Sequence, residues 1–311
     1  MAFSKGWLSC GGKVVGKKAV PYIMLAPFFV IYFVFNLFPL FFSLGISFSA
    51  WDGFNETVFV KFENYIRLFT RDKFFYQALF NTVLLLCFNT PVVILAGLLA
   101  AVFLKDFFRR TKGAIQLINF LPCITTPVAV GLLFQLMFDV KTGVVNGFLS
   151  LCGLEPYYWL GYPWSARMVV VIMTVWNGYG YMMIMLTAGL TTISDELYEA
   201  ATIDGSSWLN SFFKITIPML RPIFAFIITT SIINGLKLFD EPSLLFVTSG
   251  QQDGAFGGPD RSVLTVVMRF YEVSFRQFEF GYGSAMAYIL FIIIAFVSFF
   301  SVRLLNRDNQ A

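Results

Sequence analysis

Residues 19–51 read AVPYIMLAPFFVIYFVFNLFPLFFSLGISFSAW, a stretch of 33 residues without Asp, Glu, Lys or Arg. About 20 consecutive apolar residues suffice for an α-helix to cross roughly 30 Å of hydrocarbon. The stretch is too long for the apolar region of a signal peptide, and it lacks a small-residue cleavage site. It therefore predicts a retained membrane-spanning helix.

Five further stretches follow the same pattern along the chain. Charge-free gaps run over 74–104, 113–138, 168–194 and 280–302, and an apolar segment at 222–248 is interrupted by three charges. Of the 311 residues, 58% are hydrophobic and 13% are charged, whereas a soluble domain has about 25% charged residues. The sequence therefore predicts an all-α integral membrane protein with six transmembrane helices.

The connecting segments differ in their content of Lys and Arg. Twelve lie on the side that includes both termini: Lys5, Lys13, Lys17, Lys18, Lys105, Arg109, Arg110, Lys112, Lys214, Arg221, Arg303 and Arg307. Nine are spread over the longer segments of the other side: Lys61, Arg67, Arg71, Lys73, Lys141, Arg167, Arg261, Arg269 and Arg276. Because short cytoplasmic loops are enriched in basic residues, we expect both termini in the cytoplasm.

This topology predicts four parts of the chain. A basic cytoplasmic tail, 1–20, precedes the first transmembrane helix with its outer loop, 21–77. A core, 78–305, holds the other five helices and a cytoplasmic loop, 194–222, and a short tail, 306–311, ends the chain.

The composition disfavours catalysis by this chain. Histidine is absent, and the cysteines (Cys10, Cys87, Cys123 and Cys152) form no CxxC pair, so neither a metal site nor a histidine base is expected. The segment from Gly6 to Lys13 has the wrong spacing for a phosphate-binding loop, and Val14 replaces its Ser or Thr. An intramembrane enzyme would have only the carboxylates of the fifth span to use, and an ion channel or scaffold would not need the inner loop described next.

The inner loop, residues 195–221, is predicted to fold as a helix–turn–helix. Ser194 suits an N-cap, and Asp195 follows at the positive end of a helix. Gly205 can end this helix in the left-handed conformation, and Ser207 then caps a second helix that ends before Pro218. The loop holds four acids and two bases, which favours docking of a cytoplasmic protein over an amphipathic pair resting on anionic lipid.

The same loop carries the most specific motif. Glu199-Ala200-Ala201, Asp204-Gly205 and Ile215-x-Ile217-Pro218 resemble the EAA loop of permeases in binding-protein-dependent ATP-binding cassette importers, with Ser206 and Ile217 as mild departures. Further positions resemble the sugar-uptake, maltose-type branch: Asn64-Tyr65, Leu121-Pro122, Phe138-Asp139, Gly143, Asn146, Trp159-Leu160-Gly161, Trp176, Phe239-Asp240, Gly257-Gly258-Pro259 and Gly281-Tyr282-Gly283-Ser284-Ala285. A longer outer segment, Thr248 to Gly257, departs from that branch.

The resemblance implies a type I importer permease in a bacterial cell membrane. It implies a homologous partner permease, two ATPase subunits that bind ATP and magnesium, and an extracellular or periplasmic solute-binding protein that delivers a carbohydrate. No cofactor in this chain and no nucleic-acid partner are expected. The implied ATPase-coupling residues are Glu199, Ala200, Ala201, Asp204, Gly205, Ile215 and Pro218. An importer of glycerol phosphate or a polyamine is the alternative.

The fifth span contains three ionisable residues, Lys237, Asp240 and Glu241. Charges at membrane depth are costly toward lipid, so these side chains are expected to face protein or water. Asn234-Gly235 interrupts the span, and Pro242 then disfavours helix at Glu241. The two places together predict a broken helix of the kind that lines a transport path. The alternative is a structural ion pair between Lys237 and one of the two acids.

The fourth span carries a polar stripe. Thr174, Asn177, Gly178, Tyr181 and Met185 recur at helical spacing, and Trp176 and Tyr179 flank them. Aromatic rings beside amides and hydroxyls suit a sugar, although close helix packing is an equally common use. In the maltose-type family, solute contacts include positions matching Gly178, Tyr181 and Ser231. The predicted solute path comprises Thr174, Trp176, Asn177, Gly178, Tyr179, Tyr181, Ser231, Asn234, Gly235, Lys237 and Asp240.

Overall fold

The computed structural model describes residues 20–106, 111–247 and 256–307, and helices make up nearly all of the regular structure there. The helices are α1 Val20–Tyr32, α2 Phe38–Ser47, α3 Glu63–Thr70, α4 Lys73–Asp106, α5 Lys112–Ile124, α6 Pro127–Met137, α7 Val144–Leu151, α8 Pro163–Leu190, α9 Asp195–Ile203, α10 Trp208–Ser211, α11 Ile217–Met219, α12 Arg221–Leu236, α13 Asp240–Val247, α14 Val266–Tyr271 and α15 Phe280–Arg307. Two short antiparallel strands of two residues each, β1 Ser49–Ala50 and β2 Val58–Phe59, pair with each other. The predicted all-α class is confirmed.

Some predicted features lie outside the described residues. These are nearly all of the N-terminal tail, the turn residues Arg109 and Arg110, most of the outer segment from Thr248 to Gly257, and residues 308–311. Short turns of other helical types occur at Phe33–Leu37, Phe212–Thr216, Pro259–Arg261 and Glu272–Arg276.

Five helical segments are long and apolar enough to cross a membrane. They are Pro21–Ser47, Lys73–Lys105, Pro163–Leu190, Arg221–Phe246 and Phe280–Ser301. The predicted third span is instead a pair of helices, α5 and α6, which meet at an angle of 94°. Thr125 and Thr126 are extended there, because the residue before Pro127 is disfavoured in helix. Counting this broken pair as one span gives the six that the sequence predicts.

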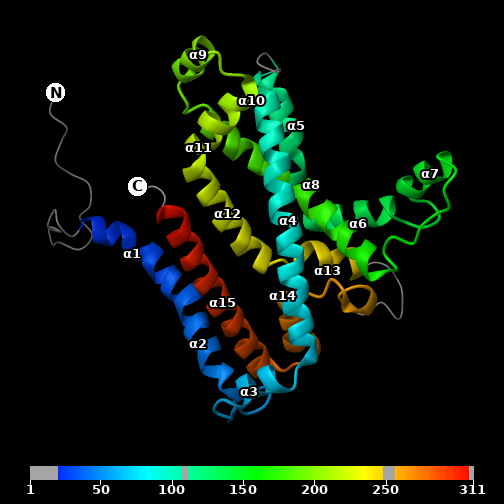
Figure 1. Ribbon diagram of the computed structural model, residues 1–311. Helices are drawn as coiled ribbons and strands as arrows, with labels where there is room; N and C mark the ends of the chain where they lie inside the picture. Colours follow the sequence, from blue (N-terminus) through cyan, green and yellow to red (C-terminus); the bar gives the residue numbers. More distant parts are fainter. Residues whose placement is uncertain (1–19, 107–110, 248–255, 308–311) are drawn as a thin grey trace, which may run out of the picture.

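The first span lies at the edge of the bundle. No residue in the most apolar stretch of this span is buried within the chain. Its second helix, α2, packs along α15 (Figure 1). Its exposed Phe and Tyr side chains are suited to lipid or to another subunit.

The centre of the bundle is formed by α4 and α8, which make the most extensive helix contact. At Gly97 of α4, an added Cβ would lie 2.5 Å from Met182 of α8, so only glycine allows this approach. At Gly180 of α8, a Cβ would overlap the backbone carbonyl of Asn119 in α5. Small residues thus bring three helices together, as is common between membrane helices.

An ion network holds the segment after α13 against the start of α4. Arg269 of α14 contacts Asp72 at 3.0 Å and Glu272 at 2.8 Å, and Arg261 contacts Glu272 at 3.0 Å. Tyr282 of α15 donates to Asp72 at 2.8 Å. This network connects Asp72, between α3 and α4, with the segment from Arg261 to Tyr282, which lies almost 200 residues further along the chain.

The two ends of the bundle differ. Helices α9 to α11 lie in the upper part of Figure 1, and α3 lies at the bottom. Helix α15 rises from the bottom and ends at about mid-height, which is also where α1 begins.

Candidate functional site

A cavity of about 510 Å³ lies between α4, α5, α8, α12 and α13. Nine of the eleven residues of the predicted solute path line it: Thr174, Asn177, Gly178, Tyr181, Ser231, Asn234, Gly235, Lys237 and Asp240. Residues of two spans that are about 60 positions apart in the sequence thus meet at one surface. Their contact with a solute remains a prediction.

The break in the fifth span places the ionisable residues in this cavity. Helix α12 ends at Leu236, the backbone N–H of Lys237 donates to the carbonyls of Asn234 and Gly235, and α13 starts at Asp240. The sequence predicted interruptions at Asn234-Gly235 and at Glu241-Pro242, and the observed break directly follows Asn234-Gly235. Pro242 instead lies in the first turn of α13, where a proline's missing N–H has no intrahelical acceptor to lose.

Lys237, Asp240 and Glu241 all line the cavity, and among the described residues none of them has an ion-pair partner within 4.0 Å. The alternative of a structural ion pair between Lys237 and one of the acids is therefore wrong for this conformation. The first turn of α13 suits the two acids, because the N-terminal end of a helix carries partial positive charge.

The fourth span presents its polar stripe to the same cavity. Thr174 Oγ1 lies 3.1 Å from Asn89 Oδ1 of α4, and Asn177 Nδ2 donates to the carbonyl of Pro122 in α5 at 2.9 Å. Tyr181 is 37% exposed, and no hydrogen bond engages its hydroxyl within the described chain. Ser231 of α12 is buried, and its hydroxyl also has no partner there. The Tyr181 hydroxyl is therefore free to bind a ligand, whereas Asn177 already holds two helices together and the Ser231 oxygen is enclosed by protein.

Trp176 and Tyr179 do not line the cavity, which corrects their predicted place on the solute path. The Trp176 ring packs 5.7 Å from that of Phe134 in α6, and Tyr179 donates to Asn119 Oδ1 at 2.5 Å. Successive residues of a helix point about 100° apart, so neighbours of the polar stripe face other helices. Met185 packs in the apolar core near the inner end and also lies off the cavity.

Sequence reasoning missed seven lining residues. They are Asn89, Val93, Cys123, Met182, Leu238, Phe239 and Glu241. Asn89 and Val93 come from α4, whose long apolar stretch shows little polar periodicity. Glu241 was recognised as an ionisable residue of the fifth span, but not as part of the path.

The inner loop folds largely as predicted. Ser194 Oγ accepts from the Glu196 backbone N–H at 3.3 Å, and α9 follows. Gly205 has φ of +74°, which a residue with a Cβ adopts only at a cost, and the Ser206 N–H closes the turn onto the Ala201 carbonyl at 2.8 Å. The predicted N-cap and left-handed glycine are both confirmed.

The second helix of the loop differs from the prediction. Ser207 Oγ accepts from the Asn210 N–H at 3.4 Å and caps α10, as expected. The helix then continues through the π-helical turn Phe212–Thr216 into α11, so Pro218 lies inside α11. The wider π turn changes the hydrogen-bond register just before the proline, whose missing N–H falls near the start of α11.

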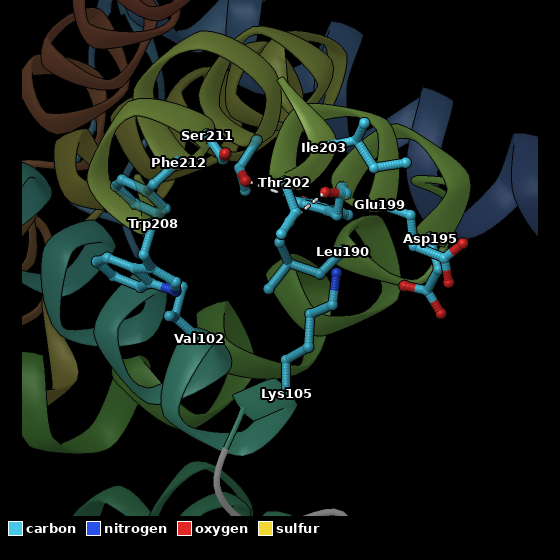
Figure 2. Close-up of a pocket in the computed structure, with 12 residues that line it drawn as sticks. Val102, Lys105, Leu190, Asp195, Glu199, Thr202, Ile203, Trp208, Ser211 and Phe212 are labelled. Carbon is cyan, nitrogen blue, oxygen red and sulfur yellow. Dashed lines mark hydrogen bonds between the residues drawn. The ribbon is translucent and has the colours of Figure 1, made fainter. Parts of the chain in front are cut away.

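A hollow of about 630 Å³ lies between this loop and the ends of α4 and α8. Figure 2 shows Trp208 and Phe212 on one side of it and Asp195 and Glu199 on the other. The Trp208 and Phe212 rings stack with centroids 5.5 Å apart. The two acids therefore face the hollow from α9, opposite an aromatic wall.

Two contacts brace α9, one within the loop and one to helix α4 of the bundle. Tyr198 of α9 shares a hydrogen bond of 2.8 Å with Thr216, and the Lys105 ammonium of α4 lies 4.1 Å from the centre of the Tyr198 ring. Of the predicted coupling residues, Glu199, Ala200, Asp204 and Gly205 are exposed, and Ala201, Ile215 and Pro218 are half-buried. Their contact with an ATPase remains a prediction. No group of three His, Cys, Asp or Glu that could hold a metal ion occurs in the described residues.

A polar cavity at a helix break among membrane-spanning helices is typical of a transport permease. The family model described as "Binding-protein-dependent transport system inner membrane component" matches residues 73–310, and the chain belongs to this family. It is therefore a multi-pass membrane component of a binding-protein-dependent transport system.

Individual relatives resemble the chain over most of its length. The arabinooligosaccharides transport system permease protein AraP of Bacillus subtilis is 32% identical, over 93% of this chain and 89% of the relative. The lactose transport system permease protein LacF of Rhizobium radiobacter is 36% identical, over 89% and 91%. A chain of a bacterial importer of the acidic polysaccharide alginate superposes with a TM-score of 0.79, covering 94% of this chain and 96% of that one at 23% identity. This last match concerns the fold.

Proposed function

We propose that the chain and a homologous partner permease form the translocation path for a carbohydrate. An extracellular solute-binding protein delivers the sugar, and two separate ATPase subunits, which bind ATP and magnesium, drive transport from the cytoplasmic side. In this arrangement both termini and the loop of α9 to α11 face the cytoplasm. The chain itself performs no catalysis.

The exposed loop supports the ATPase part of the proposal. Glu199, Asp204 and Gly205 present an acidic and conformationally fixed end of α9, while Tyr198 and Lys105 brace the opposite side. A braced helix can transmit a displacement, whereas an unsupported loop would absorb it. The loop therefore has the properties that a coupling contact requires.

The cavity and the relatives support a carbohydrate. The free Tyr181 hydroxyl and the amide of Asn234 line the cavity, and such groups pair well with sugar hydroxyls. The names of the relatives include arabinooligosaccharides, lactose, trehalose and maltose, and diacetylchitobiose. Glycerol phosphate is disfavoured, because Lys237 is the one basic residue that lines the cavity in the described part of the chain.

The observation that carries the proposal is the braced, exposed α9 on a chain of this family. The test is reconstitution of the chain with its partner permease, the ATPases and a sugar-loaded binding protein in nanodiscs or liposomes. We expect sugar-stimulated ATP hydrolysis and uptake only from the complete assembly, and none from the chain alone. Glu199→Ala should weaken ATPase retention during purification, more so at high salt, because salt screens an exposed charge contact. Glu155→Ala, in an exposed segment far from the loop, is the matched control. ATP hydrolysis by the purified single chain, or unchanged retention of the ATPases by Glu199→Ala, would contradict the proposal.

A further inference from the structure

The charged groups of the cavity bear on which sugars can enter it. Asp240 and Glu241 line it together with Lys237, and none of the three has an ion-pair partner within 4.0 Å among the described residues. Unpaired ionisable groups at membrane depth face water or a ligand, since lipid would make them costly. Their charges therefore act on whatever occupies the cavity.

The balance of these groups disfavours an anion. Positive charge stabilises a bound carboxylate, sulfonate or phosphate, and the cavity offers one ammonium beside two carboxyl groups. The remaining polar lining consists of uncharged hydroxyl and amide groups, which include those of Tyr181, Ser231 and Asn234. Such a surface hydrogen-bonds to sugar hydroxyls, and carboxylates accept further hydrogen bonds from them.

We propose that the transported sugar is uncharged and that Asp240 and Glu241 exclude sugars bearing a carboxylate or another anionic group. This inference rests on the proposed function as a carbohydrate permease and adds the charge class of the solute. It does not follow from the fold, because the alginate importer has the same fold and handles an acidic polysaccharide.

Cys123 provides a probe of the cavity's charge that needs no knowledge of the solute. This free thiol lies on α5 and lines the same cavity. In the assembled transporter, with Cys10, Cys87 and Cys152 replaced by Ser, its modification rates by a cationic and by an anionic methanethiosulfonate are compared. Each rate is normalised to the rate of a free thiol in solution, and a variant lacking Cys123 gives the background.

The expected result is faster reaction with the cationic reagent. Asp240→Asn combined with Glu241→Gln should lower the ratio of cationic to anionic rates about three- to tenfold, and Lys237→Met should raise it by a similar factor. Glu155→Gln, an exposed acid distant from the cavity, should leave the ratio unchanged. A ratio that does not respond to the carboxyl variants overturns the inference.

A second measurement tests the sugar directly. Lactose and lactose oxidised at C6 of its galactose are compared as protectants of Cys123 against an uncharged maleimide. The concentration that gives half-maximal protection should be at least tenfold lower for lactose than for the uronate. Asp240→Asn combined with Glu241→Gln should reduce that difference. Equal protection by the uronate, or protection by spermidine in place of lactose, overturns the inference while leaving the importer function intact. Absence of any sugar uptake by the complete assembly overturns the proposed function instead, and the reagent ratios still report the cavity's charge.

Discussion

Replacing Asp72 with asparagine removes the central acceptor of the ion network between α3, α4, α14 and α15. Asp72 and Arg269 are 8% and 7% exposed, and the Asp72 carboxylate accepts from Arg269 at 3.0 Å and from Tyr282 at 2.8 Å. Its other oxygen accepts from the Phe75 backbone N–H at 3.0 Å and so caps the start of α4. The substitution preserves shape but leaves the Arg269 guanidinium short of one counter-charge.

The magnitude follows from burial. Removing one partner of a buried ion pair typically costs about 3–5 kcal/mol, because the remaining charge is left uncompensated. Glu272 still contacts Arg269 at 2.8 Å, so the lower end of that range applies, about 3 kcal/mol. At about 2–4 °C per kcal/mol, the melting temperature should fall by roughly 6–12 °C.

The assay is the thermal stability of the assembled transporter in detergent, followed by size-exclusion fluorescence. The control is Glu279→Gln, which breaks the pair of Arg67 and Glu279, whose side chains are 42% and 39% exposed. An exposed pair contributes about 0–1 kcal/mol, so the control should shift melting by no more than about 4 °C. Equal shifts for the two variants would refute the reasoning that burial, and not the mere presence of an ion pair, sets the cost.

Four further tests concern Asp72, Gly180, Gly205 and Tyr181. Burial raises the pKa of Asp72, but the Tyr282 hydrogen bond and the Arg269 charge outweigh burial and leave that pKa below its ordinary value of 3.8. The stability that the ionised Asp72 contributes should therefore be present above about pH 4 and be lost as the pH falls through the folded-state pKa. Asp72→Asn should show a flatter profile of melting temperature against pH. Gly180→Ala should destabilise the assembly by about 1–3 kcal/mol, since its Cβ meets backbone, whereas Gly113→Ala, with open space around it, should melt like the parent. Gly205→Ala should cost about 1–2 kcal/mol in the loop and lower uptake while sugar binding to the receptor stays normal; uptake at the parental rate would contradict its coupling role. Tyr181→Phe should raise the half-saturating sugar concentration roughly 2- to 12-fold with ATPase retention unchanged, and an unaltered value would place the sugar elsewhere.

The sequence predicted those features that depend on local chemistry. Charge-free stretches locate five of the six spans, because the cost of burying a charge in hydrocarbon acts on each segment separately. Ser194 and Gly205 were recognisable as cap and stop because capping and positive φ are properties of single residues. Polar residues at helical spacing identified the face of α8 that lines the cavity.

Features that depend on tertiary contacts were not predictable from the sequence. Trp176 and Tyr179 resemble sugar-binding aromatics. However, the Trp176 ring packs against Phe134 of α6, and the Tyr179 hydroxyl donates to Asn119 of α5. The ion network joins Asp72 to Arg269 across almost 200 residues, and no local pattern links them. The π turn before Pro218 lies where a continuing helix accommodates a proline. The sequence around Pro218 alone predicted that the helix ends before this residue.

The position of α12 connects the two candidate sites physically. This helix begins at Arg221, directly after α11 of the inner loop, and ends at Leu236, where the cavity-lining break begins. Its 16 residues span about 24 Å at 1.5 Å per residue. Leu220 and Ile227 are fully buried against the bundle, so the helix is held along its inner half. A displacement of the loop is therefore expected to reach Lys237 and Asp240 along one continuous backbone, and the non-helical residues 237–239 are where that displacement can change the shape of the cavity.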